Sequence, residues 1–380
     1  MTDAARGFGI YVHWPYCSRI CPYCDFNVVR ERGREDEKAA LVEAIILGLQ
    51  AAADETGPRV LTSIFFGGGT PSLMDPASAG RVIDTARGLW APAQGLEISL
   101  EANPTDAERG RFADFARAGV NRLSLGVQSL RDEALVRLGR NHDARAARSA
   151  IESAQAAFPR VSVDLIYALP GQTLDAWTRD LEAVAAAGVE HISPYQLTIE
   201  RGTAFDRAVR RGSLVPPAED AAADAYETTQ AVLGAAGFEA YEVSNHARGP
   251  DVRSRHNLTY WRGGDYVGVG PGAHGRVTRG GVRFATLTAR AIGDYIRDNG
   301  AHGEAMSAHE VATERLLMGL RTNEGVAWDE LGALRIPLAA LSELEDFVML
   351  ANGRLTVTRR GRPVLDYLVG KLAARGGGRD

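Results

Sequence analysis

The amino-acid sequence predicts an α/β fold: a partial (β/α)6 barrel followed by a small C-terminal domain of winged-helix-like character. Two observations lead to this prediction. Short β-branched and aromatic runs alternate with longer alanine-rich stretches of helical periodicity, and the alternation stops near residue 243. A chain of 380 residues with 45% hydrophobic and 24% charged residues can also hold one large domain and a smaller one. A complete eight-unit barrel would need more repeats than this chain contains.

The predicted elements follow one another as β/α units. The apolar runs that we expect to be strands are 10–14, 60–66, 96–100, 122–127, 161–167, 191–197 and 238–243. The expected helices lie between them, at 38–53, 77–90, 106–118, 144–157, 174–187 and 221–234. Gly119, Gly188 and Gly237 stand between a predicted helix and the next strand, as a glycine C-cap requires.

The composition and pattern of the sequence divide the chain further. Residues 1–243 form the predicted barrel, and residues 244–304, rich in Gly, Arg, His and aromatic residues, are expected to be a connecting segment of loops and short strands. Residues 305–372 are expected to form the helical and winged domain, with helices at 310–320, 337–350 and 363–372 and a strand from Leu355. This segment has slightly more acidic than basic residues. We interpret this domain as a packing or partner domain, and we expect a disordered tail at 373–380.

The charge and the chain start exclude some classes of protein. A formal net charge of −5 with mixed signs offers no broad basic surface for nucleic acid. The chain has neither a cationic start followed by an apolar stretch nor an apolar run long enough to cross a bilayer. We therefore expect a cytoplasmic protein that does not span the membrane, with any peripheral contact made through a partner.

The three cysteines of the chain, Cys17, Cys21 and Cys24, lie within eight residues, directly after the first predicted strand. Three cysteines cannot all pair, so a disulfide framework explains them poorly. Three thiolates can bind three irons of a four-iron cluster and leave one iron open. Two alternatives stay open at this point: a zinc site with His13 as fourth ligand, and three unconnected buried thiols.

Further polar residues stand at the ends of predicted strands. The second strand runs into Gly67-Gly68-Gly69-Thr70, where the backbone is accessible to a ligand. Glu101 and Gln128 end the next two strands, Asp164 lies on the fifth, and Arg140 follows in a Leu-Gly-Arg-Asn-His sequence. Each of these could be an ordinary hydrogen-bonded or surface residue, but together they converge on one end of the sheet, which favours a ligand site.

The C-x3-C-x2-C loop, with Tyr23 before its last cysteine, resembles the signature of the radical SAM superfamily. The resemblance implies a [4Fe–4S] cluster on Cys17, Cys21 and Cys24, with S-adenosylmethionine bound to the free iron, where electron transfer from the cluster can cleave it; whether cleavage belongs to the function stays open. Together with Glu101, Gln128, Arg140 and Asp164, the sequence resembles, over most of the barrel, the branch of the oxygen-independent coproporphyrinogen III oxidases. In that branch the positions that contact S-adenosylmethionine correspond here to Tyr11, Tyr23, Gly68, Gly69, Thr70, Glu101, Gln128, Arg140 and Asp164.

A second motif separates the members of this branch. His256-Asn257-Leu258-Thr259-Tyr260-Trp261 resembles the H-N-x-x-Y-W motif of the HemW-type haem chaperones, and this resemblance covers nearly the whole chain. It implies haem as a third cofactor, acceptor haemoproteins (respiratory ones among them) as partners, and an electron donor for the cluster. The alternative is a coproporphyrinogen III decarboxylase of porphyrin biosynthesis. Those enzymes have a longer N-terminal segment and a further cysteine where this chain has Phe26, so we do not expect coproporphyrinogen dehydrogenase activity.

The haem motif also has a physical interpretation. The His256 imidazole can ligate haem iron, while Asn257, Tyr260 and Trp261 lie beside it and the two aromatic rings can pack on a porphyrin. Nearby arginines at positions 253, 255 and 262 can pair with propionates. In the alternative interpretation, His256 is an ordinary hydrogen-bonded residue, the aromatic residues form a small core, and the arginines lie on a solvated face.

Overall fold

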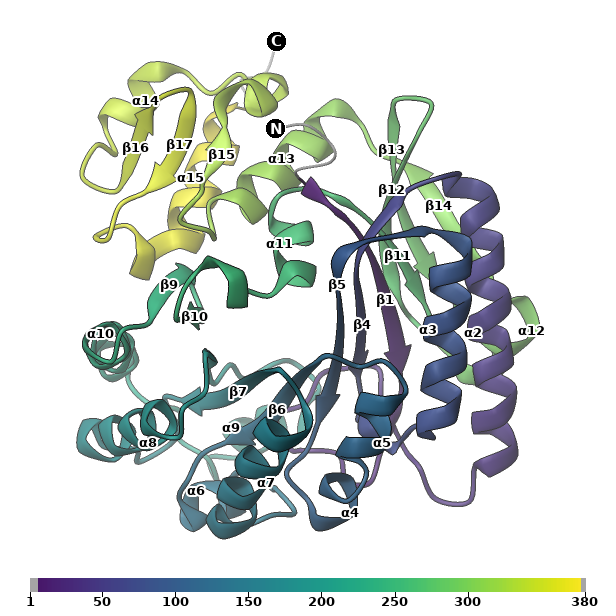
Figure 1. The fold of residues 1–380 in the computed structure, drawn as a ribbon. Coiled ribbons are helices and arrows are strands. Elements are labelled where there is room, and N and C mark those ends of the chain that lie inside the picture. The colour runs from purple at the N-terminus through teal and green to yellow at the C-terminus, as the bar shows by residue number, and fades with distance from the viewer. Residues whose placement is uncertain (1–5, 377–380) are drawn as a thin grey trace.

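The computed structural model of the protein describes residues 6–376. Within them, a twelve-stranded mixed sheet curves through the large domain (Figure 1). Its central strands are parallel neighbours in chain order: β1 (Phe8–Trp14), β4 (Val60–Gly68), β5 (Ala91–Ala102), β6 (Arg122–Gln128), β7 (Arg160–Tyr167) and β8 (His191–Gln196). Their apolar runs are buried because parallel strands are covered on both faces. The predicted partial (β/α)6 barrel is confirmed.

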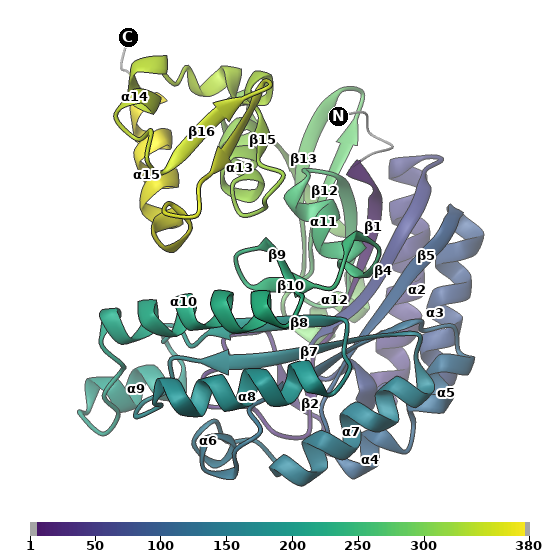
Figure 2. The ribbon, with the colours of Figure 1, turned by 60° about the vertical axis from the view of Figure 1, so that its left-hand side comes forward.

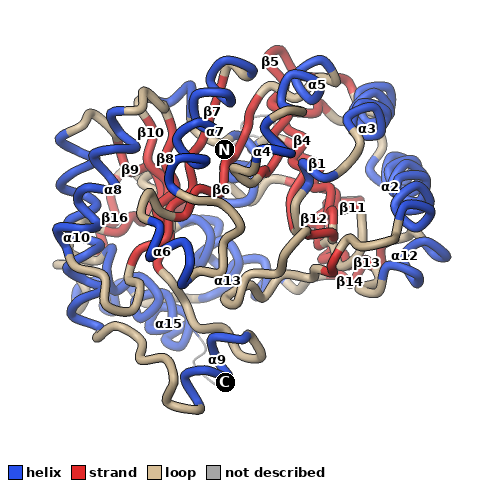
Figure 3. The backbone as a smooth tube through the Cα atoms, turned by 90° about the horizontal axis from the view of Figure 1, so that it is seen from below, coloured by secondary structure: helices blue, strands red, loops and turns tan. Residues whose placement is uncertain are grey.

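Helices cover the outer side of these strands (Figures 2 and 3). The longer ones are α2 (Glu35–Thr56), α3 (Pro76–Leu89), α7 (Ala144–Ala157), α8 (Leu174–Ala186) and α10 (Glu219–Ala235). The connections also contain the short segments η1 (Pro71–Leu73), α4 (Asp106–Arg109), α5 (Phe112–Arg117), α6 (Asp132–Arg137) and α9 (Ala204–Arg210). The side chains of Asp75, Asp143 and Thr173 cap the starts of α3, α7 and α8 by accepting a backbone N–H. The three glycines expected after helices have φ between +79° and +107°, which confirms their role as C-caps.

Two expected barrel elements differ from the prediction. The run 238–243 was expected to be a seventh parallel strand, but β9 (Glu239–Glu242) pairs antiparallel with β10 (Asn245–Ala247), and β10 pairs antiparallel with β8. Two residues connect β9 to β10, whereas a parallel crossover needs a dozen or more. The expected helix 106–118 is divided into α4 and α5, and the Arg111 side chain between them donates to the carbonyl oxygens of Ser72 and Met74.

Residues 244–304 are more than a connecting segment, which corrects the prediction. The segment β11 (Asp265–Val269) pairs parallel with β1, and the remaining strands extend the same sheet by antiparallel pairing. These elements are η2 (Pro250–Val252), α11 (Arg255–Trp261), β12 (His274–Arg279), β13 (Val282–Thr288), α12 (Ile292–Asp298) and β14 (Ala301–Ala305). The helix α11 packs against β1, β4 and β11 on the concave side of the sheet (Figure 1).

The C-terminal domain has a hydrophobic core of its own, in which Leu316, Leu355 and Leu368 are fully buried. Its elements are α13 (Ala308–Gly319), β15 (Val326–Ala327), η3 (Trp328–Leu334), α14 (Leu338–Ser342), β16 (Val348–Ala351), β17 (Arg354–Val357), η4 (Arg362–Val364) and α15 (Leu365–Gly376). The prediction of a helix at 337–350 is therefore wrong after Ser342, because α14 ends there and β16 begins at Val348. The strands β16 and β17 form a hairpin through Asn352-Gly353, both with positive φ, as a two-residue hairpin turn requires.

The tail predicted to be disordered at 373–380 overlaps α15, which extends to Gly376, so the prediction is wrong for residues 373–376. Residues 377–380 lie outside the described part of the chain. Among residues 6–376, no helix combines the length and apolar character needed to cross a membrane.

Candidate functional site

The three cysteines lie on the loop that leaves the carboxyl end of β1. Cys17 belongs to the short strand β2 (Tyr16–Cys17), which pairs with β3 (Val29–Arg30), and the Cys24 N–H donates to the Cys21 carbonyl oxygen at 3.1 Å. All three thiols are free; Cys17 is buried, and the other two are half-buried. Burial raises the pKa of the Cys17 thiol to about 12 and also raises that of Cys24, so a metal that binds there must displace protons.

A cation and a hydroxyl face these sulfur atoms. The Arg140 Nη1 group donates to Cys21 Sγ at 3.3 Å, and the Thr70 hydroxyl donates to Cys17 Sγ at 3.6 Å. The other terminal nitrogen of Arg140 donates to the Gly126 carbonyl oxygen at 2.9 Å and to the Asn103 side chain. Asn103 Nδ2 in turn donates to the Thr70 hydroxyl at 3.0 Å. Sequence reasoning missed Asn103, although it is a polar residue two positions after Glu101 at a strand end.

His13 is not free to complete a zinc site in this structure. Its Nε2–H donates to the Asn27 carbonyl oxygen at 2.9 Å, so its Nδ1 accepts from the Tyr11 hydroxyl, also at 2.9 Å. Burial lowers the pKa of His13, which keeps the ring neutral. Both ring nitrogens therefore have protein partners, and the zinc alternative lacks its fourth ligand.

The glycine loop brings the end of β4 against the cysteine loop. The N–H groups of Gly69 and Thr70 donate to the carbonyl oxygens of Trp14 and Tyr16, at 2.7 and 2.8 Å, and the Gly68 N–H donates to Glu101 Oε2 at 3.1 Å. A Cβ atom on Gly69 would lie 2.7 Å from the Tyr16 carbonyl oxygen. Glycine is required here for close backbone packing, and this packing places the Thr70 hydroxyl beside Cys17.

The remaining predicted S-adenosylmethionine residues fall into two groups. Tyr23 and Gln128 lie on the cysteine-loop side. Tyr23 packs against Phe205. The Gln128 amide lies close to Gly126, since a Cβ atom on Gly126 would be 2.9 Å from Gln128 Nε2. Tyr11, Glu101 and Asp164 instead line a cavity of about 180 Å³ inside the barrel. Burial and then the nearby Asp164 raise the pKa of Glu101 to about 8, so Glu101 is protonated at neutral pH.

The second motif lies on α11 and reaches the same cavity through His256, Asn257 and Tyr260. His256 is 1% exposed, and its ring stacks on Phe65 with centroids 4.9 Å apart. Its Nδ1 is 3.0 Å from the Ser63 hydroxyl, and its Nε2 bonds the Tyr260 hydroxyl. The imidazole is therefore enclosed in the barrel, with a partner on each nitrogen.

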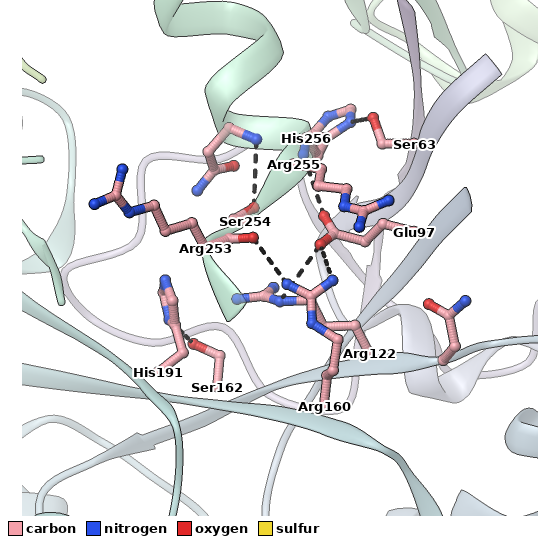
Figure 4. A network of polar contacts seen from close by, with 12 residues as sticks. Ser63, Glu97, Arg122, Arg160, Ser162, His191, Arg253, Ser254, Arg255 and His256 are labelled. Carbon is pink, nitrogen blue, oxygen red and sulfur yellow. Dashed lines mark hydrogen bonds and ion pairs between the residues drawn. The ribbon is translucent and has the colours of Figure 1, made fainter. Parts of the chain in front are cut away.

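The start of α11 is fixed by a buried carboxylate. Glu97 of β5 accepts the His256 N–H at 3.1 Å and pairs with Arg160 Nη1 at 2.7 Å (Figure 4). Ser254 caps the helix by accepting the Asn257 N–H, and the Ser254 N–H donates to the Tyr241 hydroxyl. These contacts hold α11 on the concave side of the sheet.

The other residues of this region have structural partners. Trp261 is 9% exposed and packs with Tyr241 in a small core, which matches the small-core interpretation of this residue. Arg253 pairs with Glu239 at 2.8 Å, Arg255 donates to the Gly95 carbonyl oxygen, and Arg262 pairs with Glu324 at 2.6 Å. The expected propionate partners are thus already engaged within the chain.

A curved parallel sheet with three cysteines after its first strand is the arrangement of the radical SAM proteins, and residues 11–184 match the model described as the radical SAM superfamily. The radical S-adenosyl methionine domain-containing protein 1, mitochondrial, of Bos taurus is 40% identical over 96% of this chain and 87% of its own. The heme chaperone HemW of Mycobacterium tuberculosis is 38% identical over 96% of this chain and 94% of its own. The chain therefore belongs to the radical SAM superfamily and, within it, to the HemW family, as the sequence motifs predicted.

A solved structure shares the fold. Coproporphyrinogen III oxidase (HemN) from Escherichia coli superposes with a TM-score of 0.80 over 98% of this chain and 92% of its own, at 21% sequence identity.

The first prediction concerns the cysteine loop. Anaerobic reconstitution with iron and sulfide should give about four irons per chain, measured by metal analysis and thiolate absorbance. Cys21→Ser or Cys24→Ser should lose most of this iron and keep the wild-type circular dichroism, because both residues lie on a loop outside the core. Ser18→Ala, an exposed position between the cysteines, is the matched control and should keep its iron. Zinc in place of iron would contradict the assignment.

The second prediction concerns Glu101. If Glu101 hydrogen-bonds S-adenosylmethionine, as the sequence predicts, Glu101→Ala should weaken equilibrium binding by about 1–3 kcal/mol, measured by calorimetry on the reconstituted protein. Glu43→Ala alters an exposed carboxylate on α2, paired with Arg81, and should leave the affinity unchanged. Equal affinity in wild type and Glu101→Ala would show that this carboxyl does not contact the ligand.

The third prediction concerns the buried His256. Burial, and then the charge of Arg122, lower its pKa from 6.5 to about 3. Between these values the unfolded chain takes up a proton that the folded chain does not, so this residue makes stability fall as the pH drops from about 6.5 towards 3. The contribution reaches about 1.4 kcal/mol per pH unit.

Urea unfolding at pH 7, 6 and 5 measures this effect. His256→Gln should reduce the pH dependence by about one proton. The control His302→Gln, whose side chain is 81% exposed, should keep the wild-type dependence. An unchanged dependence in His256→Gln would mean that this imidazole becomes charged in the folded protein.

Proposed function

We propose that the protein is a haem chaperone, which binds haem, passes it to acceptor haemoproteins, and carries a [4Fe–4S] cluster and S-adenosylmethionine. One observation carries this proposal: the similarity to the heme chaperone HemW of Mycobacterium tuberculosis extends over 96% of this chain. It thus includes α11 and the C-terminal domain as well as the barrel. The barrel alone would support the radical SAM class and nothing more specific.

The cysteine loop fits a cluster. Three thiols come from one loop, the Arg140 guanidinium contacts one of them, and the buried Arg140 Nε has no hydrogen-bond partner among the described residues. A [4Fe–4S] cluster on Cys17, Cys21 and Cys24 would supply an open iron for S-adenosylmethionine and an electron for its reductive cleavage.

The surrounding residues would bind and orient S-adenosylmethionine. Arg140 places a positive charge beside the sulfur ligands, where it favours the anionic cluster. The protonated Glu101 can donate one hydrogen bond to a ribose hydroxyl and accept another, while Tyr11 and Asp164 line the same cavity. Gln128, Tyr23, Gly68, Gly69 and Thr70 would complete the site from the cysteine-loop side.

We retain His256, Asn257, Tyr260 and Trp261 as the proposed haem site, with a condition that the geometry sets. Haem ligation requires the His256 ring to lose either the Tyr260 or the Ser63 hydroxyl as a hydrogen-bond partner. A cavity of about 180 Å³ is also smaller than the ~300–1,000 Å³ of typical ligand pockets. Haem binding at this motif therefore requires α11 to move out of the concave face.

The runner-up function is decarboxylation of coproporphyrinogen III. Phe26, which stands where those enzymes have a further cysteine, is 62% exposed beside the cysteine loop and supplies no thiol. The likeness to HemN concerns the fold, and we therefore favour the chaperone. We further propose that the protein acts in the cytoplasm, receives electrons from a separate donor, and serves respiratory haemoproteins among its acceptors.

The fourth prediction separates a carrier from an enzyme. The reconstituted protein should bind haem stoichiometrically, measured by absorbance titration, and should lose that haem to an apo-haemoprotein acceptor. An unrelated apo-protein is the control and should receive none. Reduced protein with S-adenosylmethionine should not convert coproporphyrinogen III over repeated turnovers. Sustained decarboxylation without haem transfer would favour the runner-up.

The His256→Ala variant tests the haem site separately. If His256 ligates the iron, the haem spectrum of this variant should differ from that of the wild type, because the axial ligand sets the electronic state of the iron. An unchanged spectrum with reduced protein stability would restrict His256 to its role in holding α11.

A further inference from the structure

In the interior of the barrel, two arginine side chains share one carboxylate. Arg122, at the start of β6, is 3% exposed, and its Nε lies 4.0 Å from Glu97 Oε2. The same carboxylate oxygen is 2.7 Å from Arg160 Nη1. Figure 4 shows both arginines beside Glu97. One carboxylate therefore faces two guanidinium groups, and the closer contact belongs to Arg160.

Arg160 also has a hydrogen-bond partner that Arg122 lacks among the described residues. Arg160 also donates through Nη2 to the Arg253 carbonyl oxygen at 2.8 Å. Among residues 6–376, no hydrogen bond uses a guanidinium nitrogen of Arg122, and this side chain lines the barrel cavity. A buried guanidinium has five N–H donors and is stable only when they and its charge are satisfied. The unused donors of Arg122 face the cavity.

Among the described residues, neither acid of the cavity forms an ion pair with Arg122. Glu101 accepts the Gly68 N–H, and Asp164 accepts the Ser124 hydroxyl at 3.0 Å. Burial raises the pKa of both carboxyl groups, and the nearby charge of Arg122 acts in the opposite direction on Asp164. The remaining polar groups that line the cavity near Arg122 include the side chains of Ser124, Ser193 and Asn257, which are uncharged.

We propose that Arg122 binds the carboxylate of a ligand in this cavity, through the paired N–H donors of its guanidinium group. Arginine recognises carboxylates by two parallel hydrogen bonds, and the site is buried enough to make them strong. The cavity of about 180 Å³ accommodates a short carboxylate group and not a porphyrin ring. The carboxylate has two possible sources: a free small acid, or the propionate arm of a haem whose ring stays outside the cavity.

The experiment measures both sources on the full chain. Calorimetry with sodium propionate tests the free acid. Absorbance titration with haem and with haem dimethyl ester, which lacks the free carboxylates, tests the arm. The haem titration rests on the proposed function, whereas the propionate titration does not, so the two can fail separately. The variants are Arg122→Gln, Arg122→Lys and the control Arg81→Gln, an exposed arginine on α3.

Removing a charged hydrogen-bond partner should weaken binding by about 10- to 100-fold. Arg122→Gln should show this loss for propionate, or should lose the preference for haem over its ester, and Arg81→Gln should match the wild type. Loss for propionate with an unchanged preference for haem identifies a small acid as the ligand. Loss of the haem preference identifies the propionate arm. Arg122→Lys, which keeps the charge but not the fork, should bind with intermediate strength.

The proposal is overturned if Arg122→Gln binds both probes as the wild type does. If Arg122→Gln does not fold, the wild type and Arg122→Lys provide the test. The proposal is overturned if the wild type neither binds propionate nor prefers haem over the ester. It is also overturned if Arg122→Lys binds both probes with the affinity of the wild type.

Discussion

The ion pair between Glu97 and Arg160 fixes the position of α11, and the interior of the barrel depends on it. Glu97 comes from β5, Arg160 comes from β7, and the Glu97 carboxylate also accepts the backbone N–H of His256. Removing Glu97 would leave Arg122 and Arg160 without this carboxylate, and an uncompensated buried charge costs about 3–5 kcal/mol. The helix α11 is thus held on the concave face by these polar contacts together with the small apolar core that contains Trp261 and Tyr241.

The position of α11 makes the two predicted sites neighbours. Tyr11, Glu101 and Asp164 reach the barrel cavity from the strands, and His256 and Tyr260 reach it from the helix. A ligand that displaces α11 therefore changes the walls of the cavity that the S-adenosylmethionine residues share. By thermodynamic linkage, the two ligands must then affect the affinity of each other by the same factor. This connection follows from packing, since the two motifs are more than ninety residues apart in the sequence.

The elements that the sequence predicted well are those whose signal is local. The barrel strands and helices followed from alternating apolar runs, and the glycine C-caps from the need for positive φ. The errors occurred where pairing decides the structure. β9 has the composition of a barrel strand, but its short connection to β10 makes it antiparallel. The β16–β17 hairpin contains an Asn-Gly turn that was available as a signal, but the apolar residues before it also suited a helix.

The sequence by itself determined the class of this protein. Three cysteines in one short loop, glycine and polar residues at strand ends, and the motif at 256–261 need no folded structure to be recognised, because ligand spacing and turn chemistry are local properties. Only the tertiary structure decided which side chains are available. It gave His13 and His256 partners on both ring nitrogens, engaged Arg253, Arg255 and Arg262 elsewhere, and left Arg122 facing the cavity. The physical reason is that hydrogen-bond and charge satisfaction depends on residues far away in the chain, which only folding brings together.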